Sequence, residues 1–115
     1  MKLSKHLLDQ VAHLKSDARS GDEKRSAPRV GLRVGVDLYL ESDAGERGVG
    51  VTVRDISAAG ISLVYREPIP RGTMFAMRLP RRDGKIMGLC CTVKHCRKVA
   101  DRLYAIGAEF TRFAA

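Results

Sequence analysis

Residues 49–60 read Val49-Gly-Val-Thr-Val-Arg-Asp55-Ile-Ser57-Ala-Ala-Gly60. Valine stands at every second position in the first half, which is the period of a strand that buries one face and exposes the other. The alternation stops after Asp55, and the small and polar residues from Ser57 to Gly60 are typical of a tight turn. The stretch therefore predicts a half-buried β-strand that leads into a further strand.

The same two-residue period recurs on both sides of this stretch. Every even position from Val30 to Leu40 is apolar, which predicts a long strand before it. Four more strands are expected after it, at residues 61–65, 73–79, 86 to about 97 and 104–110. One face of the fifth strand would carry Met87, Leu89, Cys91, Val93 and His95.

The connections between these strands are short and rich in turn-forming residues. Prolines 68 and 70 end the third strand, Asp83-Gly84 marks a tight hairpin, and a last turn is expected at residues 100–102. Strands at this spacing favour a small barrel or sandwich, because closure removes exposed sheet edges. We expect a mainly β protein: a six-stranded antiparallel β-barrel with a short N-terminal α-helix.

Apolar residues at helical spacing predict this helix, which runs from residue 4 to about residue 18. Its apolar stripe consists of Leu7, Val11, Leu14 and Ala18. Ser4 is placed as its N-cap. A helix this short is marginal in isolation, so it must pack on a partner or, as we expect, on the barrel.

The chain between the helix and the first strand has a different composition. Residues 15–28 contain almost no apolar side chains, which predicts a mobile linker. We therefore divide the chain into residues 1–23, the amphipathic helix with its charged linker, and residues 24–115, the β-barrel domain.

Composition limits the classes of function. The chain has 115 residues, enough for one domain with a modest core, and it lacks tryptophan. Its formal net charge of +8 and isoelectric point near 9.9 favour phosphate-bearing partners of any kind. No signal peptide or apolar span of membrane length is visible, so we expect a cytoplasmic protein.

Neither a metal site nor a catalytic site is predicted. The cysteines, Cys90, Cys91 and Cys96, lack Cys-x-x-Cys spacing, and one strand cannot aim four ligands together even with His95 beside them. We expect reduced, half-buried thiols, with Cys90 and Cys91 on opposite faces of the strand. The histidines have no nucleophile to activate, His95 is expected to be partly buried, and no enzyme activity is expected.

Two motifs carry the functional information. Arg25-Ser-Ala-Pro-Arg29 directly precedes the first strand, and Asp55-Ile-Ser57-Ala-Ala-Gly60 ends the second. In this order and strand context they resemble the two halves of the cyclic di-GMP site of PilZ domains. The resemblance extends over roughly residues 24–110 and includes the closing segment 104–110, which is similar to the last strand of that family.

The resemblance implies a six-stranded barrel and a set of ligand-binding residues. Those residues are Arg25, Arg29, Asp55, Ser57 and Gly60. It also implies that the residue before the first arginine, here Lys24, influences whether one cyclic di-GMP or a stacked pair is bound. A basic side chain helps to neutralise the phosphates of a pair, so a dimeric ligand is expected; the alternative for Lys24 is a solvated linker lysine.

The chemistry of these side chains suits that ligand. An arginine fork donates two parallel hydrogen bonds to a phosphate or to guanine O6 and N7. The carboxylate of Asp55 can accept from guanine N1–H and N2–H, and Ser57 adds a hydroxyl. Gly60 would permit a positive φ and a close approach of the ligand.

A purely structural explanation remains open for each position. Arg25 and Arg29 could be solvated charges of a basic linker. Asp55 and Ser57 could form a turn that caps the hairpin, with Gly60 as its left-handed residue.

The resemblance implies a receptor or adaptor without cofactor or metal, whose only small ligand is cyclic di-GMP. Ligand binding is expected to order the arginine linker over the barrel and to signal to a protein partner in motility, biofilm or surface attachment. Two alternatives stay open: a ligand-independent adaptor with the same barrel, and a basic nucleic-acid-binding barrel. The second would need exposed stacking aromatics, whereas Phe75, Tyr104 and Phe110 are expected in the core.

Overall fold

The structure is a computed structural model, and it describes residues 1–11, 30–40 and 48–114. Its elements are helix α1 (Lys5–Val11) and strands β1 (Val30–Leu40), β2 (Gly48–Ile56), β3 (Gly60–Tyr65), β4 (Met74–Pro80), β5 (Ile86–Ala100) and β6 (Leu103–Phe113). All expected strands are present. Their bounds differ from the predicted ones by a few residues: β5 continues to Ala100 instead of ending near Arg97, and β6 continues to Phe113 instead of ending at Phe110.

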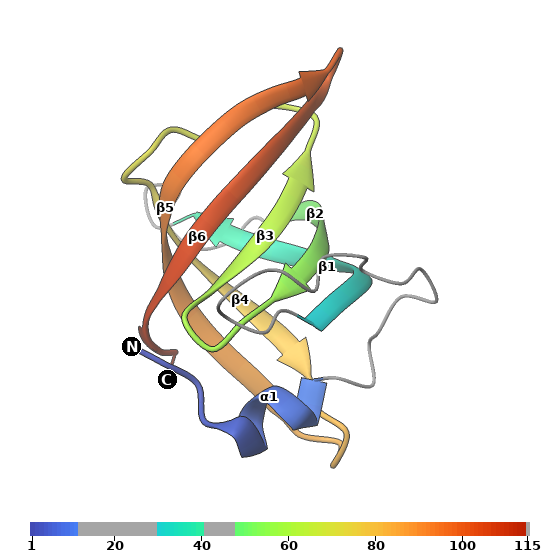
Figure 1. Cartoon of the computed structure of the whole chain (residues 1–115), viewed down its shortest axis with the longest axis vertical. Coiled ribbons are helices and arrows are strands. Elements are labelled where there is room, and N and C mark those ends of the chain that lie inside the picture. Colours follow the sequence, from blue (N-terminus) through green and yellow to red (C-terminus); the bar gives the residue numbers. More distant parts are fainter. Residues whose placement is uncertain (12–29, 41–47, 115) are drawn as a thin grey trace, which may run out of the picture.

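The strands form a closed antiparallel barrel in the order β1-β2-β3-β6-β5-β4, which confirms the expected architecture. Strand β6 lies between β3 and β5, so the second half of the chain completes a sheet that the first half begins. Figure 1 shows β5 and β6 as a long hairpin whose tip projects beyond the rest of the barrel. This order places β2, β3, β6 and β5 side by side.

The barrel interior is apolar. Val53, Leu63, Leu89 and Phe110 are each fully buried, and Phe75 is 2% exposed. The expected core positions of Phe75 and Phe110 are therefore confirmed. Tyr104 is only half-buried, because it lies on β6 near the projecting hairpin tip.

Helix α1 packs on the barrel, as expected. The backbone N–H of Leu7 donates to Ser4 Oγ at 3.2 Å, which is the predicted N-cap bond. Val11 is fully buried and Leu3 is 4% exposed. The predicted continuation through Leu14 and Ala18 lies outside the described residues, as does the proposed domain boundary at residues 23 and 24.

The hairpin between β4 and β5 is held by its own polar groups and by the helix. Gly84 has a φ of +86°, as the Asp-Gly turn requires. The backbone N–H of Lys85 donates to Asp83 Oδ1 at 3.0 Å and lowers the pKa of that carboxyl, with a further contribution from the charge of Arg81. The Gln10 carbonyl accepts from the Arg82 N–H at 2.8 Å, which ties the hairpin to α1.

Candidate ligand-binding site

A β-bulge turns Asp55 to the outer face of the barrel. Val53 pairs with Leu63, whereas Asp55 pairs with Ser62, so Arg54 is an extra residue in β2. Without this insertion, strict alternation would point Asp55 inward with the valines. With it, Asp55 is half-buried on the outside and Ile56 enters the core.

The turn after β2 is closed by Ser57 and Gly60. The backbone N–H of Ser57 donates to the Gly60 carbonyl at 2.9 Å, and the Gly60 N–H donates to Ser57 Oγ at 3.3 Å. Ser57 therefore has the turn-forming role that the sequence left open. This role is compatible with ligand contact, because a hydroxyl oxygen can take part in several hydrogen bonds.

Position 60 requires a glycine, but for a different reason from the one predicted. Its φ is not positive; among the described glycines only Gly72 and Gly84 have positive φ. The expected left-handed conformation is therefore wrong, because Gly60 is the first residue of strand β3. A Cβ at this position would collide with the backbone oxygen of Ala108 on β6. The close approach of a neighbouring strand, rather than a turn, requires the glycine.

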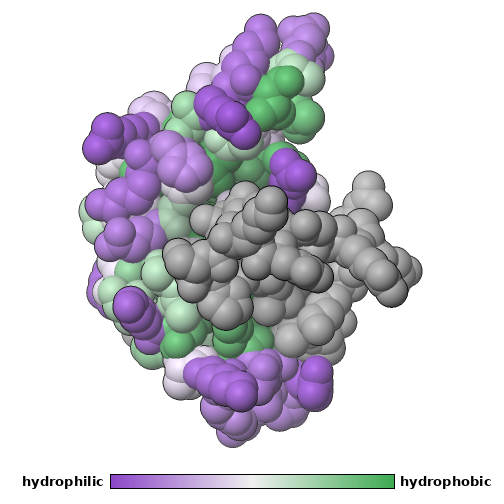
Figure 2. All heavy atoms as spheres, in the orientation of Figure 1, coloured by the Kyte–Doolittle hydropathy of each residue, from purple (hydrophilic) through white to green (hydrophobic). Residues whose placement is uncertain are grey.

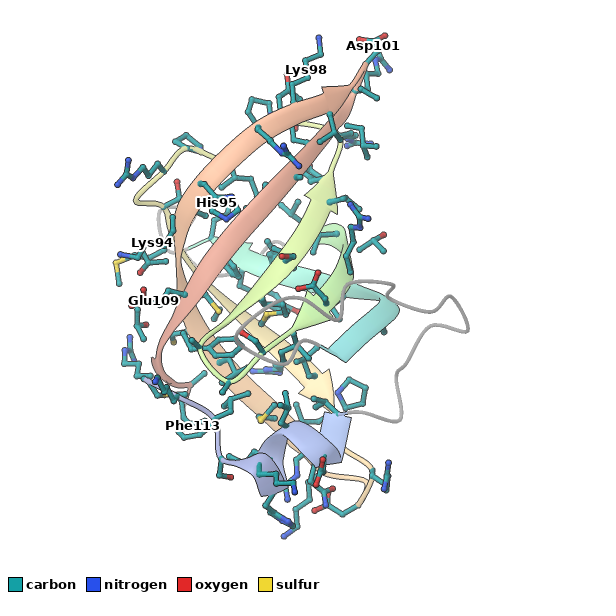
Figure 3. The ribbon with its side chains drawn as sticks, viewed as in Figure 1. Lys94, His95, Lys98, Asp101, Glu109 and Phe113 are labelled. Carbon is teal, nitrogen blue, oxygen red and sulfur yellow. The ribbon has the colours of Figure 1, made fainter. Side chains whose placement is uncertain are left out.

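The three described motif residues meet in one hollow. Asp55, Ser57 and Gly60 all line a solvent-open depression of about 190 Å³ on the outer face of β2, β3 and β6. The same depression is lined by three ionisable side chains that the resemblance does not name: Lys94, His95 and Glu109. We call it the motif hollow. Figure 3 labels these three residues along the β5–β6 hairpin.

A second bulge brings Lys94 and His95 into this hollow. Val93 pairs with Ala108 and His95 with Gly107, so Lys94 is an extra residue in β5. His95 therefore does not share a face with Val93, and it is exposed rather than partly buried, so both expectations for it are wrong. Its ring occupies the space that a Cβ of Gly107 would fill. Gly107 is buried on an outward-facing position because the imidazole covers it.

The remaining predicted residues, Lys24, Arg25 and Arg29, lie outside the described residues. The strand that follows them has a defined place: Val30 pairs with Ile56, directly before the Ser57 turn. Strand β1 therefore begins next to the second motif.

Cys90 and Cys96 are half-buried, as expected, whereas Cys91 is fully buried rather than half-buried. The difference between Cys90 and Cys91 is in keeping with opposite faces of β5, and all three cysteines are free. Burial, with a smaller contribution from neighbouring Cys90, raises the pKa of Cys91 to about 12. Such a thiol is a poor nucleophile and a poor metal ligand at neutral pH. Within the described ranges, no three His, Cys, Asp or Glu side chains are grouped to hold a metal ion.

Comparison with known proteins identifies the fold family. The sequence model of the PilZ domain matches residues 23–114, which is most of the chain. The chain belongs to the PilZ domain family. This family consists of cyclic di-GMP receptors and adaptors rather than enzymes.

A solved structure agrees with this assignment. The Bacillus subtilis inhibitor of motility, MotI/DgrA, superposes with a TM-score of 0.56 at 15% sequence identity. The match covers 81% of the PilZ chain and 44% of MotI/DgrA, so the chain spans less than half of that protein. At this identity the likeness concerns the fold. No protein of curated function matches the chain significantly.

Helix α1, the helix that the structure describes for this PilZ protein, lacks the length and apolarity to span a bilayer.

Proposed function

We propose that this PilZ protein is a receptor for cyclic di-GMP and passes the signal to a protein partner. The observation that carries the proposal is the convergence of Asp55, Ser57 and Gly60 on one outer hollow. Strict alternation would have pointed Asp55 inward, so the bulge at Arg54 is needed to place the motif at the surface. Bulges are common where a side chain must be re-aimed at a functional site.

The motif hollow suits part of the ligand. Its volume of about 190 Å³ is below the range of roughly 300–1,000 Å³ that is usual for pockets enclosing a whole small molecule. One guanine can enter, with its N1–H and N2–H donors on the Asp55 carboxylate. The phosphates then extend beyond the hollow, where Arg25 and Arg29 are proposed to bind them. Strand β1 starts beside the Ser57 turn, so the arginine motif is joined to the barrel at this point.

The proposed signal is a change of conformation of the arginine linker on ligand binding. The backbone N–H of Leu3 donates to the Ala58 carbonyl at 2.6 Å, and the Phe110 N–H donates to the Ala59 carbonyl at 3.0 Å. The turn that would contact ligand is therefore hydrogen-bonded both to the segment before α1 and to β6. A ligand that binds one arrangement of this turn more tightly would shift the equilibrium toward it, and the arginine linker and α1 would move with the turn. The shift in free energy can be no larger than the difference in the ligand's binding free energy between the two arrangements. Lys24 would help to hold a stacked pair of ligand molecules.

The partner is proposed to belong to the control of motility, biofilm formation or surface attachment. The structural neighbour supports motility in particular, since it is an inhibitor of motility. We propose a cytoplasmic location and no catalytic activity, in keeping with the receptor and adaptor roles of the family.

The test is a calorimetric titration with cyclic di-GMP at near-physiological salt, with GTP and a cyclic adenine dinucleotide as controls. Selective binding of about one or two ligands per chain is expected, and a ratio near two would support a stacked pair held with the help of Lys24. Arg25→Ala and Asp55→Ala should each abolish or strongly weaken binding. Thermal unfolding of the unliganded Arg25→Ala variant should stay nearly unchanged.

Two results would contradict the proposal. A folded wild-type protein that gives no heat with cyclic di-GMP would leave a ligand-independent adaptor. Equal affinity for the cyclic adenine dinucleotide would remove the role of Asp55 in selecting guanine.

A further inference from the structure

A second depression adjoins the motif hollow on the outer face. It has a volume of about 420 Å³ and is lined by Arg54, Asp55, Ser62, Leu63, His95, Arg97, Ala105 and Ile106. We call it the arginine hollow. Asp55, Ser62 and His95 line both depressions, so the two form one continuous trough across the sheet.

The floor of the trough follows the strand register. Asp55 pairs with Ser62, Ser62 pairs with Gly107, and Gly107 pairs with His95, so these residues form a row across β2, β3, β6 and β5. Three strand spacings make the row about 14 Å long. The two middle residues are small, but the His95 ring folds back over Gly107. The open part of the floor is therefore at Ser62, between Asp55 and the His95 ring.

The two ends of the trough differ in charge. Asp55 and Glu109 face the motif hollow with one formal cation, Lys94. The arginine hollow instead has two formal cations, Arg54 and Arg97, with Asp55 as its acid. A guanine edge with N–H donors therefore prefers the motif hollow, and a phosphate prefers the arginine hollow. Glu109 repels a phosphate from the motif hollow and so opposes the reverse orientation.

The two arginines come from opposite walls of the trough. Arg54 is the extra residue of the β2 bulge, next to Asp55, and Arg97 is on β5, two residues beyond His95. Both are exposed, and neither makes a hydrogen bond or ion pair within the part of the chain that the structure describes. Their forks are therefore available to an anion. Figure 2 shows hydrophilic side chains along much of the β5–β6 hairpin, with hydrophobic ones near its tip.

We propose that Arg54 and Arg97 form a phosphate-binding subsite of the cyclic di-GMP site. One guanine occupies the motif hollow against Asp55, and the phosphate attached to that nucleoside lies in the arginine hollow between the two guanidinium groups. This inference rests on the proposed function. It adds two phosphate-binding residues on the rigid barrel to the arginines of the N-terminal motif.

The test compares three variants by calorimetric titration with cyclic di-GMP at several salt concentrations. Arg54→Ala and Arg97→Ala should each weaken binding about tenfold, as expected for the loss of a charge-assisted hydrogen bond. Each should also make binding less sensitive to salt, because the variant has lost an ion pair that salt screens. Arg78→Ala is the matched control, since Arg78 is an exposed strand arginine that lines neither hollow. It should bind within about twofold of wild type.

A conservative variant separates fork geometry from charge. Arg97→Lys keeps the charge but loses the planar fork, so it should recover only part of the affinity lost in Arg97→Ala. If wild type binds but Arg54→Ala and Arg97→Ala bind as tightly as Arg78→Ala, the phosphate subsite is wrong and the receptor function stands. If folded wild type does not bind at all, the receptor function itself fails and the subsite with it.

Discussion

At the scale of single residues, Gly60 serves both the fold and the candidate site: it lines the motif hollow, and its lack of a Cβ lets β3 lie close to β6. It opens β3 and pairs with Glu109, and a Cβ there would collide with the Ala108 oxygen. A backbone oxygen of a paired strand cannot move aside as a flexible side chain can. Gly60→Ala is therefore expected to lower the free energy of unfolding by about 2 kcal/mol, which chemical denaturation would measure.

Gly35 on β1 supplies the control for this substitution. A Cβ at Gly35 would have the Val51 oxygen as its nearest neighbour, at 4.0 Å, which is ordinary contact. Gly35→Ala should be neutral or slightly stabilising, because alanine loses less backbone entropy on folding. Equal stability of the Gly60→Ala and Gly35→Ala variants would show that β3 and β6 separate without cost.

The sequence predicted the motif residues that line the motif hollow, but not the other charged residues that line it. Asp55, Ser57 and Gly60 were identified by spacing, although the structure assigns a different cause to Gly60. Lys94 and Glu109 carried no signal, because a charged residue on the outer face of a strand is ordinary. Only the strand order places Glu109 beside Gly60, and pairing between distant strands is not encoded in local periodicity.

At the scale of elements, two bulges decide which side chains reach the site. In β2 and in β5 an apolar alternation ends with a polar residue at the next inward position, Asp55 after Val53 and His95 after Val93. In both strands an extra residue precedes the polar one and turns it outward. A polar residue that continues a buried alternation is thus a signal for a bulge. The face predicted for His95 was wrong because strict alternation was assumed through it.

Helix α1 is an element whose stability comes from the barrel. Its described part has seven residues, fewer than the ~12–15 that an isolated helix needs in water, and Val11 in this part is fully buried. Val11→Ala is therefore expected to cost about 2 kcal/mol in stability, from lost burial and the cavity that remains. Amide hydrogen exchange should also rise locally, at the Leu8 N–H that donates to the Ser4 carbonyl.

His6→Ala provides the matched change on the exposed side of the same helix. It should alter stability by no more than about 0.5 kcal/mol. If Val11→Ala is equally mild and leaves the exchange of Leu8 unchanged, the helix does not depend on its packing against the barrel.

At the scale of the whole molecule, closure of the barrel creates the trough. Period-two patterns predict which face of each strand is buried, but they leave open which strands are neighbours. The insertion of β6 between β3 and β5 places the small residues Gly107 and Ala105 on the floor and Arg97 on the far wall. The net charge of +8 predicted an anionic partner of some kind. Only the fold shows that Glu109 lines one hollow of the trough while Arg54 and Arg97 line the other.

Stability of the whole barrel at high pH depends on a group in its core. The pKa of Cys91 is raised from 9.0 to about 12, chiefly by burial. Between these values the unfolded chain loses the thiol proton while the folded chain keeps it. The unfolded state then binds fewer protons, so stability is full below pH 9 and falls as the pH rises toward 12.

This linkage predicts a slope of up to about 1.4 kcal/mol per pH unit above the unfolded-state pKa. Cys91→Ala removes the thiol and should cost about 1 kcal/mol at neutral pH, since it leaves a small cavity. The stability advantage of wild type over Cys91→Ala should therefore shrink above pH 9 and reverse by about pH 10. Denaturant titrations of both proteins across this range would measure the difference. The control is Cys90→Ala, at the half-buried neighbour, whose free energy of unfolding should fall with pH as steeply as that of wild type. Parallel curves for wild type and Cys91→Ala would mean that the Cys91 thiol ionises in the folded barrel as readily as in the unfolded chain.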